Sequence, residues 1–261
     1  MNSLINKIVK KNIHCYFISP HFDDAVLSSG GLMLSLSDKV PISVINVFTK
    51  AARGPYTLSA RMHLRKNKFK DARMLYTVRN NEDKKVLGKL GVKRINLGFI
   101  EALYRKKSID KTSSLMGKLI PEITHVYPIF RLHVVGENMS GREKELESEI
   151  SEKLKKLVKK ESIVFCPLGL GGHIDHIIVR DVCLKNFKNL VFWFDFPYSE
   201  KEPKTFYSLL EEIGLEVFSF KNNLKKKKEM VLGYKSQVMN LFKNKDFSLP
   251  PEKFLINKVS N

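Results

Sequence analysis

Residues 15–49 read CYFISPHFDDAVLSSGGLMLSLSDKVPISVINVFT, and this stretch decides the fold class. The short apolar run Cys15–Ser19 predicts a strand that ends at Pro20–His21. Apolar side chains then recur at helical spacing from about Ala25 to Leu36, and Ile42–Phe48 predicts a second, β-branched strand. A strand, a helix and a strand in this order predict a parallel sheet wrapped by helices.

The alternation continues through the rest of the chain. We expect further strands at Arg94–Gly98, Ser162–Pro167, Leu190–Phe196 and Leu215–Phe220. We expect helices at about Ala60–Leu90, at Arg142–Lys159, after His173 through Leu184, near Thr205–Ile213 and at Leu224–Phe242. Prolines and polar breaks indicate a less regular insertion at about 101–141, and the tail after residue 246 looks loop-like.

Length and composition indicate one folded domain. The 261 residues can bury a full core, and 43% of them are hydrophobic and 28% charged, which is typical of a soluble globular chain. No repeat or linker divides the sequence. We therefore expect a single α/β domain over residues 1–261, with a Rossmann-like, mostly parallel sheet and helices on both faces.

The net charge of +19 favours anionic partners such as nucleic acid, phospholipid head groups or phosphorylated substrates. The basic residues are mostly lysines spread along the whole chain, which favours an ordinary solvated surface instead. We interpret the run Lys225–Lys228 in the same way, as a solvated helix face, and expect no nucleic-acid partner.

The cysteines and the apolar runs predict a cytoplasmic location. Cys15, Cys166 and Cys183 form no CxxC pair and are expected to be buried free thiols, which suits a reducing compartment. The N-terminal apolar run is too short for a signal peptide, and no stretch approaches 18 uninterrupted apolar residues, so no transmembrane segment is expected.

Two short segments carry the chemistry, and both directly follow predicted strands. The first is Ser19–Ala25 (SPHFDDA), and the second is Gly172–His176 (GHIDH). Open parallel sheets bind their ligands just beyond the carboxyl ends of the strands. Together the segments supply three histidines and three aspartates in two tight turns.

The spacing within each segment permits metal binding. His21 and Asp24 are three positions apart on a turn that enters a helix, so their side chains can converge, while Asp23 projects differently and is free to act on a water. His173 and His176 are also three apart, with Asp175 available to hold an imidazole in one tautomer. Two imidazoles and one carboxylate leave a fourth position open, which is typical of catalytic zinc.

Each segment also has a structural interpretation. Asp23 and Asp24 suit a helix N-terminus, where Asp caps the helix and complements its dipole. His173 could cap a helix after the glycine turn in the same way. The occurrence of two such turns, each with a carboxylate beside metal-type ligands, favours the functional interpretation.

The two segments resemble the P-H-x-D-D and H-x-D-H motifs of the LmbE-like, or PIG-L, deacetylases. The resemblance extends over most of the chain, through Arg79 and Glu82 in an R-x-x-E pattern, Leu97–Phe99 after a strand, and Tyr234, Ser236 and Gln237 in the predicted final helix. Phe22 stands where the family commonly has Pro, and Ala25 where it frequently has Glu. Neither position is a proposed ligand, so the expected chemistry is unaffected.

The resemblance implies a role for each site residue. His21, Asp24 and His176 would bind Zn²⁺, Asp23 would be the general base, a protonated His173 would face the oxyanion, and Asp175 would orient a histidine. Arg79 matches a position that contacts substrate, and Glu101 stands where the family often has Asp. The implied activity is removal of an N-acetyl group from an amino sugar or sugar conjugate, which releases acetate and a free amine.

Two other functions are less well supported by the sequence, and one observation narrows the substrate of the deacetylase hypothesis. A two-metal phosphoesterase would need more ligands than the two segments offer. A basic nucleic-acid- or lipid-binding protein on a degenerate fold would have no need of the complete set of ligands. Within the deacetylase hypothesis, Arg53, Arg61, Arg65 and Arg79 are expected to rim the site, which favours an anionic sugar substrate. The sequence does not indicate the oligomeric state.

Overall fold

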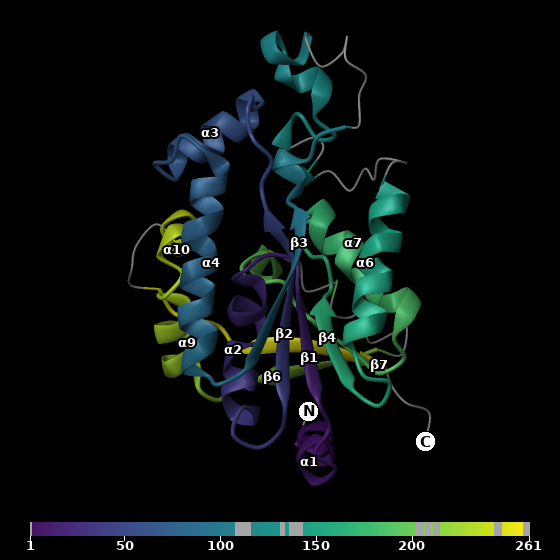
Figure 1. The fold of residues 1–261 in the computed structure, drawn as a ribbon. Helices are drawn as coiled ribbons and strands as arrows, with labels where there is room; N and C mark the ends of the chain where they lie inside the picture. The colour runs from purple at the N-terminus through teal and green to yellow at the C-terminus, as the bar shows by residue number, and fades with distance from the viewer. Residues whose placement is uncertain are drawn as a thin grey trace.

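The computed structural model describes residues 2–107, 116–130, 134–135, 143–201, 206, 210, 215–242 and 247–257. Its centre is a seven-stranded sheet of order β3-β2-β1-β4-β5-β7-β6 (Figure 1). The strands are β1 Cys15–Ser19, β2 Ile42–Lys50, β3 Lys93–Ile100, β4 Ile163–Pro167, β5 Leu190–Trp193, β6 Leu215–Phe220 and β7 Glu252–Asn257. β7 pairs antiparallel with β5 and β6, and the other neighbours pair in parallel. The predicted single α/β domain with a mostly parallel sheet is confirmed.

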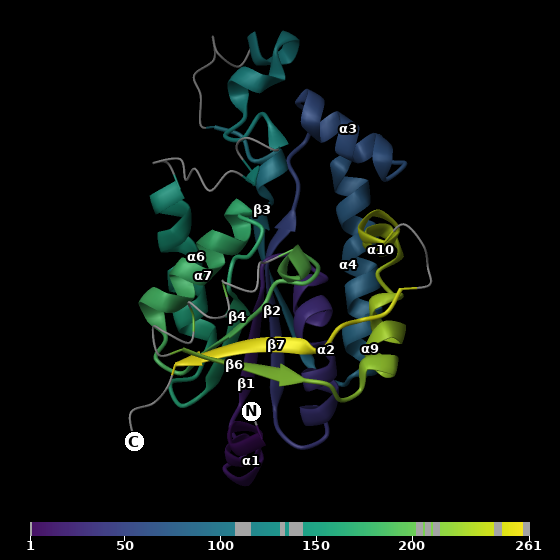
Figure 2. The same cartoon turned by 180° about the vertical axis from the view of Figure 1, so that it is seen from behind.

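Helices cover both faces of the sheet. They are α1 Asn2–Lys10, α2 Asp24–Leu36, α3 Leu58–Lys66, α4 Ala72–Lys89, α6 Glu143–Leu157, α7 Ile174–Asn186, α9 Leu224–Val231 and α10 Lys235–Leu241. Figures 1 and 2 show α2, α4, α9 and α10 on one side and α6 and α7 on the other. The buried apolar side chains form two main clusters. Because side chains alternate along β1, Phe17 packs in one cluster while Tyr16 and Ile18 pack in the other. Burial on both faces explains why this strand reads as a continuous apolar run.

The prediction of one helix over Ala60–Leu90 is wrong in one respect. This region forms two helices, α3 and α4, which are separated by residues 67–71. Lys68 adopts a left-handed backbone with φ of 62°, which ends α3. Asp71 then caps α4 by accepting a 2.7 Å hydrogen bond from the Arg73 N–H. Local capping therefore overrides the continuous helical periodicity.

The helix predicted over Leu224–Phe242 is likewise two helices, α9 and α10. Gly233 lies at the break, where an added Cβ would meet Val86 Cγ2 at 2.4 Å. The break turns α10 against α4, where the Tyr234 hydroxyl donates to Asp83 at 2.8 Å. Glu82 accepts from the backbone N–H and the hydroxyl of Ser236 at 3.0 and 2.6 Å. These contacts join the two helices that carry the R-x-x-E and Tyr-x-Ser-Gln patterns.

Two further expectations differ from the structure. The tail predicted as a loop contains β7, which inserts between β5 and β6. Lys227, expected on a solvated face, is buried and pairs with Glu252 at 2.9 Å. The two carboxylate oxygens of Glu252 also accept from the N–H groups of Gly31 and Leu32 at 2.7 and 2.9 Å, so the start of β7 holds α2.

Other expectations were met, and some fall outside the described residues. The three cysteines are free and buried, as predicted. The helix expected near Thr205–Ile213 lies outside the described residues except for residues 206 and 210, as does much of the 101–141 insertion. Short 3₁₀ turns within that insertion are Ala102–Tyr104 and Pro121–Thr124. In the described ranges, none of the helices combines the length and apolar character needed to cross a bilayer.

Candidate active site

The predicted site residues lie where the strand order reverses. From β1 the chain moves outward to β2 and β3, and it later returns to place β4 on the other side of β1. The crevice between the carboxyl ends of two such strands is the usual ligand site of an open parallel sheet. His21 follows β1 and His173 follows β4, so the topology brings the two motifs together.

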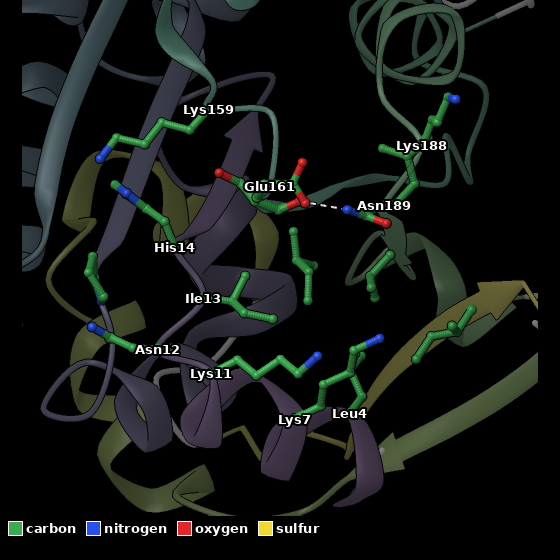
Figure 3. Close-up of a pocket in the computed structure, with 16 residues that line it drawn as sticks. Leu4, Lys7, Lys11, Asn12, Ile13, His14, Lys159, Glu161, Lys188 and Asn189 are labelled. Atoms are coloured by element: carbon green, nitrogen blue, oxygen red, sulfur yellow. Dashed lines mark hydrogen bonds between the residues drawn. The ribbon is translucent and has the colours of Figure 1, made fainter.

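A cavity of about 160 Å³ opens at this point. Its lining includes every predicted site residue except Asp175: His21, Asp23, Asp24, Arg79, Glu101, His173 and His176. A larger cavity of about 790 Å³ lies at the amino ends of the strands beside α1, and Lys7, Lys11 and His14 line it (Figure 3). Among the described residues, both groups of side chains able to hold a metal include His21, so the smaller cavity carries the chemistry.

Three side chains form a donor set that fits zinc. Asp24 Oδ2 lies 3.1 Å from His21 Nδ1 and 3.3 Å from His176 Nε2. Adjacent ligands about 2.0–2.1 Å from a tetrahedral zinc ion are about 3.3 Å apart, so these spacings suit the ion. Burial opposes ionisation of Asp24, but the two imidazoles outweigh it and hold its pKa well below the usual range. The residues therefore fit a zinc ion, with one face of the set open to the cavity.

A second group, His21, His173 and Asp175, also lies close enough to share an ion. The oxygens of Asp175 are already engaged, because Oδ1 accepts from Arg105 Nη2, while Oδ2 accepts from the Ala102 N–H at 2.9 Å and lies 3.2 Å from His21 Nε2. Burial opposes ionisation of Asp175, but Arg105 and His21 outweigh it and lower its pKa. These contacts favour the first group as the metal site and place Asp175 behind His21.

The other histidine of the donor set is held by a residue that the sequence analysis missed. Asp195 Oδ1 lies 2.7 Å from His176 Nδ1, and Oδ2 accepts from the N–H groups of Gly169 and Leu170 at 2.7 and 2.9 Å. A carboxylate behind a metal-binding imidazole fixes its tautomer. Each histidine of the donor set thus contacts an aspartate through the ring nitrogen that does not face Asp24. The available signal was a lone aspartate directly after the apolar run Leu190–Phe194, which forms the strand beside β4.

Asp23 is buried at the N-terminus of α2, yet its side chain makes no capping hydrogen bond. The structural interpretation of this residue as a helix cap is therefore not supported. Burial, and next the charge of Asp24, raise the pKa of Asp23 to about 7, while Arg79 opposes the shift. A carboxylate with such a pKa can accept and release a proton near neutral pH.

His173 does cap a helix, since its Nδ1 accepts a 3.2 Å hydrogen bond from the Asp175 N–H at the start of α7. Burial, followed by the charge of His21, lowers the pKa of His173 to about 3. A neutral ring whose Nδ1 accepts must carry its proton on Nε2. These contacts favour a neutral His173 that donates through Nε2 over the protonated ring that the resemblance implies.

Arg79 and Glu101 also line the cavity. Arg79 Nη1 lies 3.7 Å from Glu101 Oε2, and within the described chain Arg79 Nε and Glu101 Oε2 are buried without hydrogen-bond partners. Burial raises the pKa of Glu101 to about 7. Buried polar atoms without partners beside a cavity are available to a ligand.

The expected basic rim is wrong for three of its four members. Of Arg53, Arg61, Arg65 and Arg79, only Arg79 lines the cavity. Arg61 and Arg65 line a separate hollow of about 480 Å³. The lining of the cavity also includes three side chains that sequence reasoning did not identify, His63, Phe130 and Tyr198. It includes Gln237 as well, which the sequence analysis named only as part of the family resemblance.

Comparisons with known proteins identify the family of the chain and structures that share its fold. The family model described as "PIG-L: GlcNAc-PI de-N-acetylase" matches residues 16–186. A deacetylase of the teicoplanin biosynthesis pathway has a similar structure, with a TM-score of 0.69 and 22% identity over 95% of this chain and 100% of that one. The N,N′-diacetylchitobiose deacetylase of Pyrococcus horikoshii gives a TM-score of 0.52 and 13% identity over 98% and 92% of the two chains. A search of curated proteins finds no match. The structural likenesses show a shared fold, and the family model, which spans more than half of the sequence, shows that the chain belongs to the PIG-L family.

Proposed function

We propose that this protein is a zinc-dependent hydrolase that removes the N-acetyl group from an amino sugar or sugar conjugate, releasing acetate and a free amine. The observation that carries the proposal is the His21–Asp24–His176 donor set with the uncapped carboxylate of Asp23 beside it. Membership in a family described as de-N-acetylases supports the same activity. The similar folds of a deacetylase from teicoplanin biosynthesis and of an N,N′-diacetylchitobiose deacetylase support it as well.

The donor set supports a proposal for the metal ligands. His21, Asp24 and His176 would hold the zinc ion, with Asp175 and Asp195 fixing the two imidazoles from behind. A zinc ion bound there supplies Lewis acidity toward the acetamide oxygen and lowers the pKa of water. The set of three ligands and an open position is that of a catalytic site.

The remaining groups divide the proton transfers. Asp23 takes a proton from the attacking water and later delivers it to the leaving amine, which suits its pKa of about 7. His173 donates its Nε2–H to the oxygen that gains negative charge as the carbonyl is attacked. Arg79 and Glu101 bind the hydroxyl or charged groups of the sugar with their unpartnered polar atoms.

Release of acetate from a panel of N-acetylated sugars tests the proposal. We expect activity on at least one acetamido sugar, loss of activity on zinc removal by a chelator, and recovery on adding zinc. The panel should include neutral N-acetylglucosamine compounds and phosphorylated or nucleotide-linked counterparts. Full activity in metal-free protein, or full zinc occupancy in His176→Ala, would contradict the metal assignment.

A further inference from the structure

Exposed apolar side chains gather in two segments of the described chain. Leu119 is 87% exposed, Met62 64% and Leu58 59%. With five others they form what we call the apolar rim: Leu58, Met62, Met116, Leu119, Ile120, Ile123, Ile129 and Phe130. The other large apolar side chains exposed in the described ranges, Val9, Met74 and Leu184, belong to α1, α4 and α7. A concentration of this kind is typical of an interaction surface.

The two segments of the rim form one surface. Leu58 in α3 donates its N–H to Glu122 Oε1 at 2.8 Å, and the Phe130 N–H donates to Ser59 Oγ at 3.3 Å. Figures 1 and 2 show α3 and the teal segment after β3 at one end of the molecule, and α1 at the other. The rim also borders the active site, since Phe130 lines the catalytic cavity with its ring centroid 6.3 Å from that of His173.

Cations accompany the apolar side chains. Leu58, Arg61, Met62 and Arg65 are spaced i, i+3, i+4 and i+7 along α3, so they share one exposed helix face. The hollow of about 480 Å³ is lined by Tyr56, Arg61, Leu64, Arg65, Lys68, Phe69 and Lys70, with no carboxylate among them. Among the described residues, none of these four cations forms an ion pair.

We propose that the apolar rim docks on the surface of an anionic phospholipid membrane. Its apolar side chains would enter the boundary between head groups and acyl chains, while Arg61, Arg65, Lys68 and Lys70 bind lipid phosphates. The aliphatic stems of these cations can lie along the apolar layer with their charges at the head groups. The surface does not depend on the proposed deacetylase activity, although docking would turn the catalytic cavity toward the membrane.

Charge favours a lipid surface over a second copy of the chain. A symmetric pairing would bring the same patch of two copies together. It would bring the four cations of each copy close to those of the other, and like charges at close range repel. The carboxylate of Glu122 interacts with Arg61 and offsets only part of this charge. An anionic head-group layer complements the same cations, and the net charge of +19 adds to the attraction.

Co-sedimentation of the full chain with phospholipid vesicles tests the proposal. We expect binding to vesicles of phosphatidylcholine with phosphatidylglycerol, and much weaker binding to phosphatidylcholine alone. Arg61→Gln/Arg65→Gln should weaken binding about 30-fold, from the usual contribution of each cation near an anionic surface. Leu119→Ser/Ile120→Ser should weaken it at least about tenfold.

Matched variants separate the rim from general properties of the surface. Leu184→Ser removes an apolar side chain that is 54% exposed on α7, close to the 51% of Ile120, and should bind as the unmodified chain does. Lys225→Gln/Lys226→Gln removes two exposed charges on α9 and should have little effect. Circular dichroism and thermal unfolding confirm that each variant is folded, and Asp23→Asn should retain vesicle binding whatever its activity.

Three results would overturn the proposal. They are the absence of binding to anionic vesicles, an equal loss in the Lys225/Lys226 or Leu184 controls, and a dimer that Leu119→Ser/Ile120→Ser dissociates in light scattering. The last result would assign the rim to a second copy of the chain. Vesicle binding is measured without substrate, so failure of the deacetylase proposal leaves this experiment unaffected.

Discussion

Replacing Asp195 by asparagine changes almost no volume but should reverse the hydrogen bond behind His176. Asp195 Oδ2 accepts from the N–H groups of Gly169 and Leu170, and these donors would hold the asparagine oxygen in that position. The amide NH₂ would then face His176 Nδ1, where the carboxylate now lies at 2.7 Å. An N–H group cannot donate to a nitrogen that carries a proton, so the substitution favours a proton on Nε2 instead.

The tautomer determines whether His176 can bind metal, because a ring nitrogen that carries a proton has no lone pair for the ion. Loss of such a supporting carboxylate typically weakens metal affinity about 10–100-fold. This range corresponds to about 1.4–2.7 kcal/mol of binding free energy. The expected loss is partial, because His21 and Asp24 remain and the ring can still change tautomer at a cost.

Competition with a chelator of known zinc affinity measures the effect on Asp195→Asn. Asp181→Asn is the matched control, because this carboxylate is on α7, pairs with Arg180 at 2.7 Å and does not touch the donor set. We expect unchanged affinity in the control. Zinc affinity in Asp195→Asn equal to that of the unmodified chain would refute the assignment of Asp195 as the group that fixes His176.

Three further predictions follow from the site and from the packing beneath it. Asp23→Asn should keep its zinc, as metal analysis will show, and lose about 10²–10⁴-fold in turnover, since the change removes a base and little volume; loss of zinc with substantial activity after reloading would make Asp23 a ligand. Because the pKa of Asp23 is raised to about 7 and a base must be ionised, kcat/KM should fall as pH drops through about 7, and a profile without this limb would contradict the role. Glu252→Ala should lower the free energy of unfolding by about 3–5 kcal/mol in denaturant titrations, because it leaves Lys227 buried without its partner; a loss below about 1 kcal/mol would show that the pair contributes little.

The sequence was sufficient for the parts of the site that are local. The side chains of each motif are within six residues of one another and directly follow a strand, so strand periodicity and parallel topology together bring the two motifs to one crevice. The same periodicity failed at two helix breaks, one set by local capping and the other by tertiary packing. Residues 67–71 and Gly233 interrupt helical patterns because capping by Asp71 and close packing on Val86 prevail there.

The parts that could not be predicted depend on contacts between distant segments. Asp195 supports His176 from the segment that follows β5, and Arg105 pairs with Asp175 across 70 positions of sequence. The charge expected on His173 did not take account of burial, which is a property of the folded chain and lowers the pKa of the ring. Arg61 and Arg65 lie close in sequence to residues that line the cavity, but their own side chains line a different hollow.

The position of β7 also constrains when the enzyme can first work during its synthesis. All three proposed metal ligands have been translated once residue 176 emerges. Glu252, which holds α2 through Gly31 and Leu32, is made 76 residues later. Until then β5 has no neighbour on one side, and an unpaired strand edge is a site for wrong pairing or for a chaperone. A nascent chain that already contains all three proposed ligands would therefore still have an incomplete sheet. Ribosomes stalled between residues 176 and 252 should carry protein that is sensitive to proteolysis.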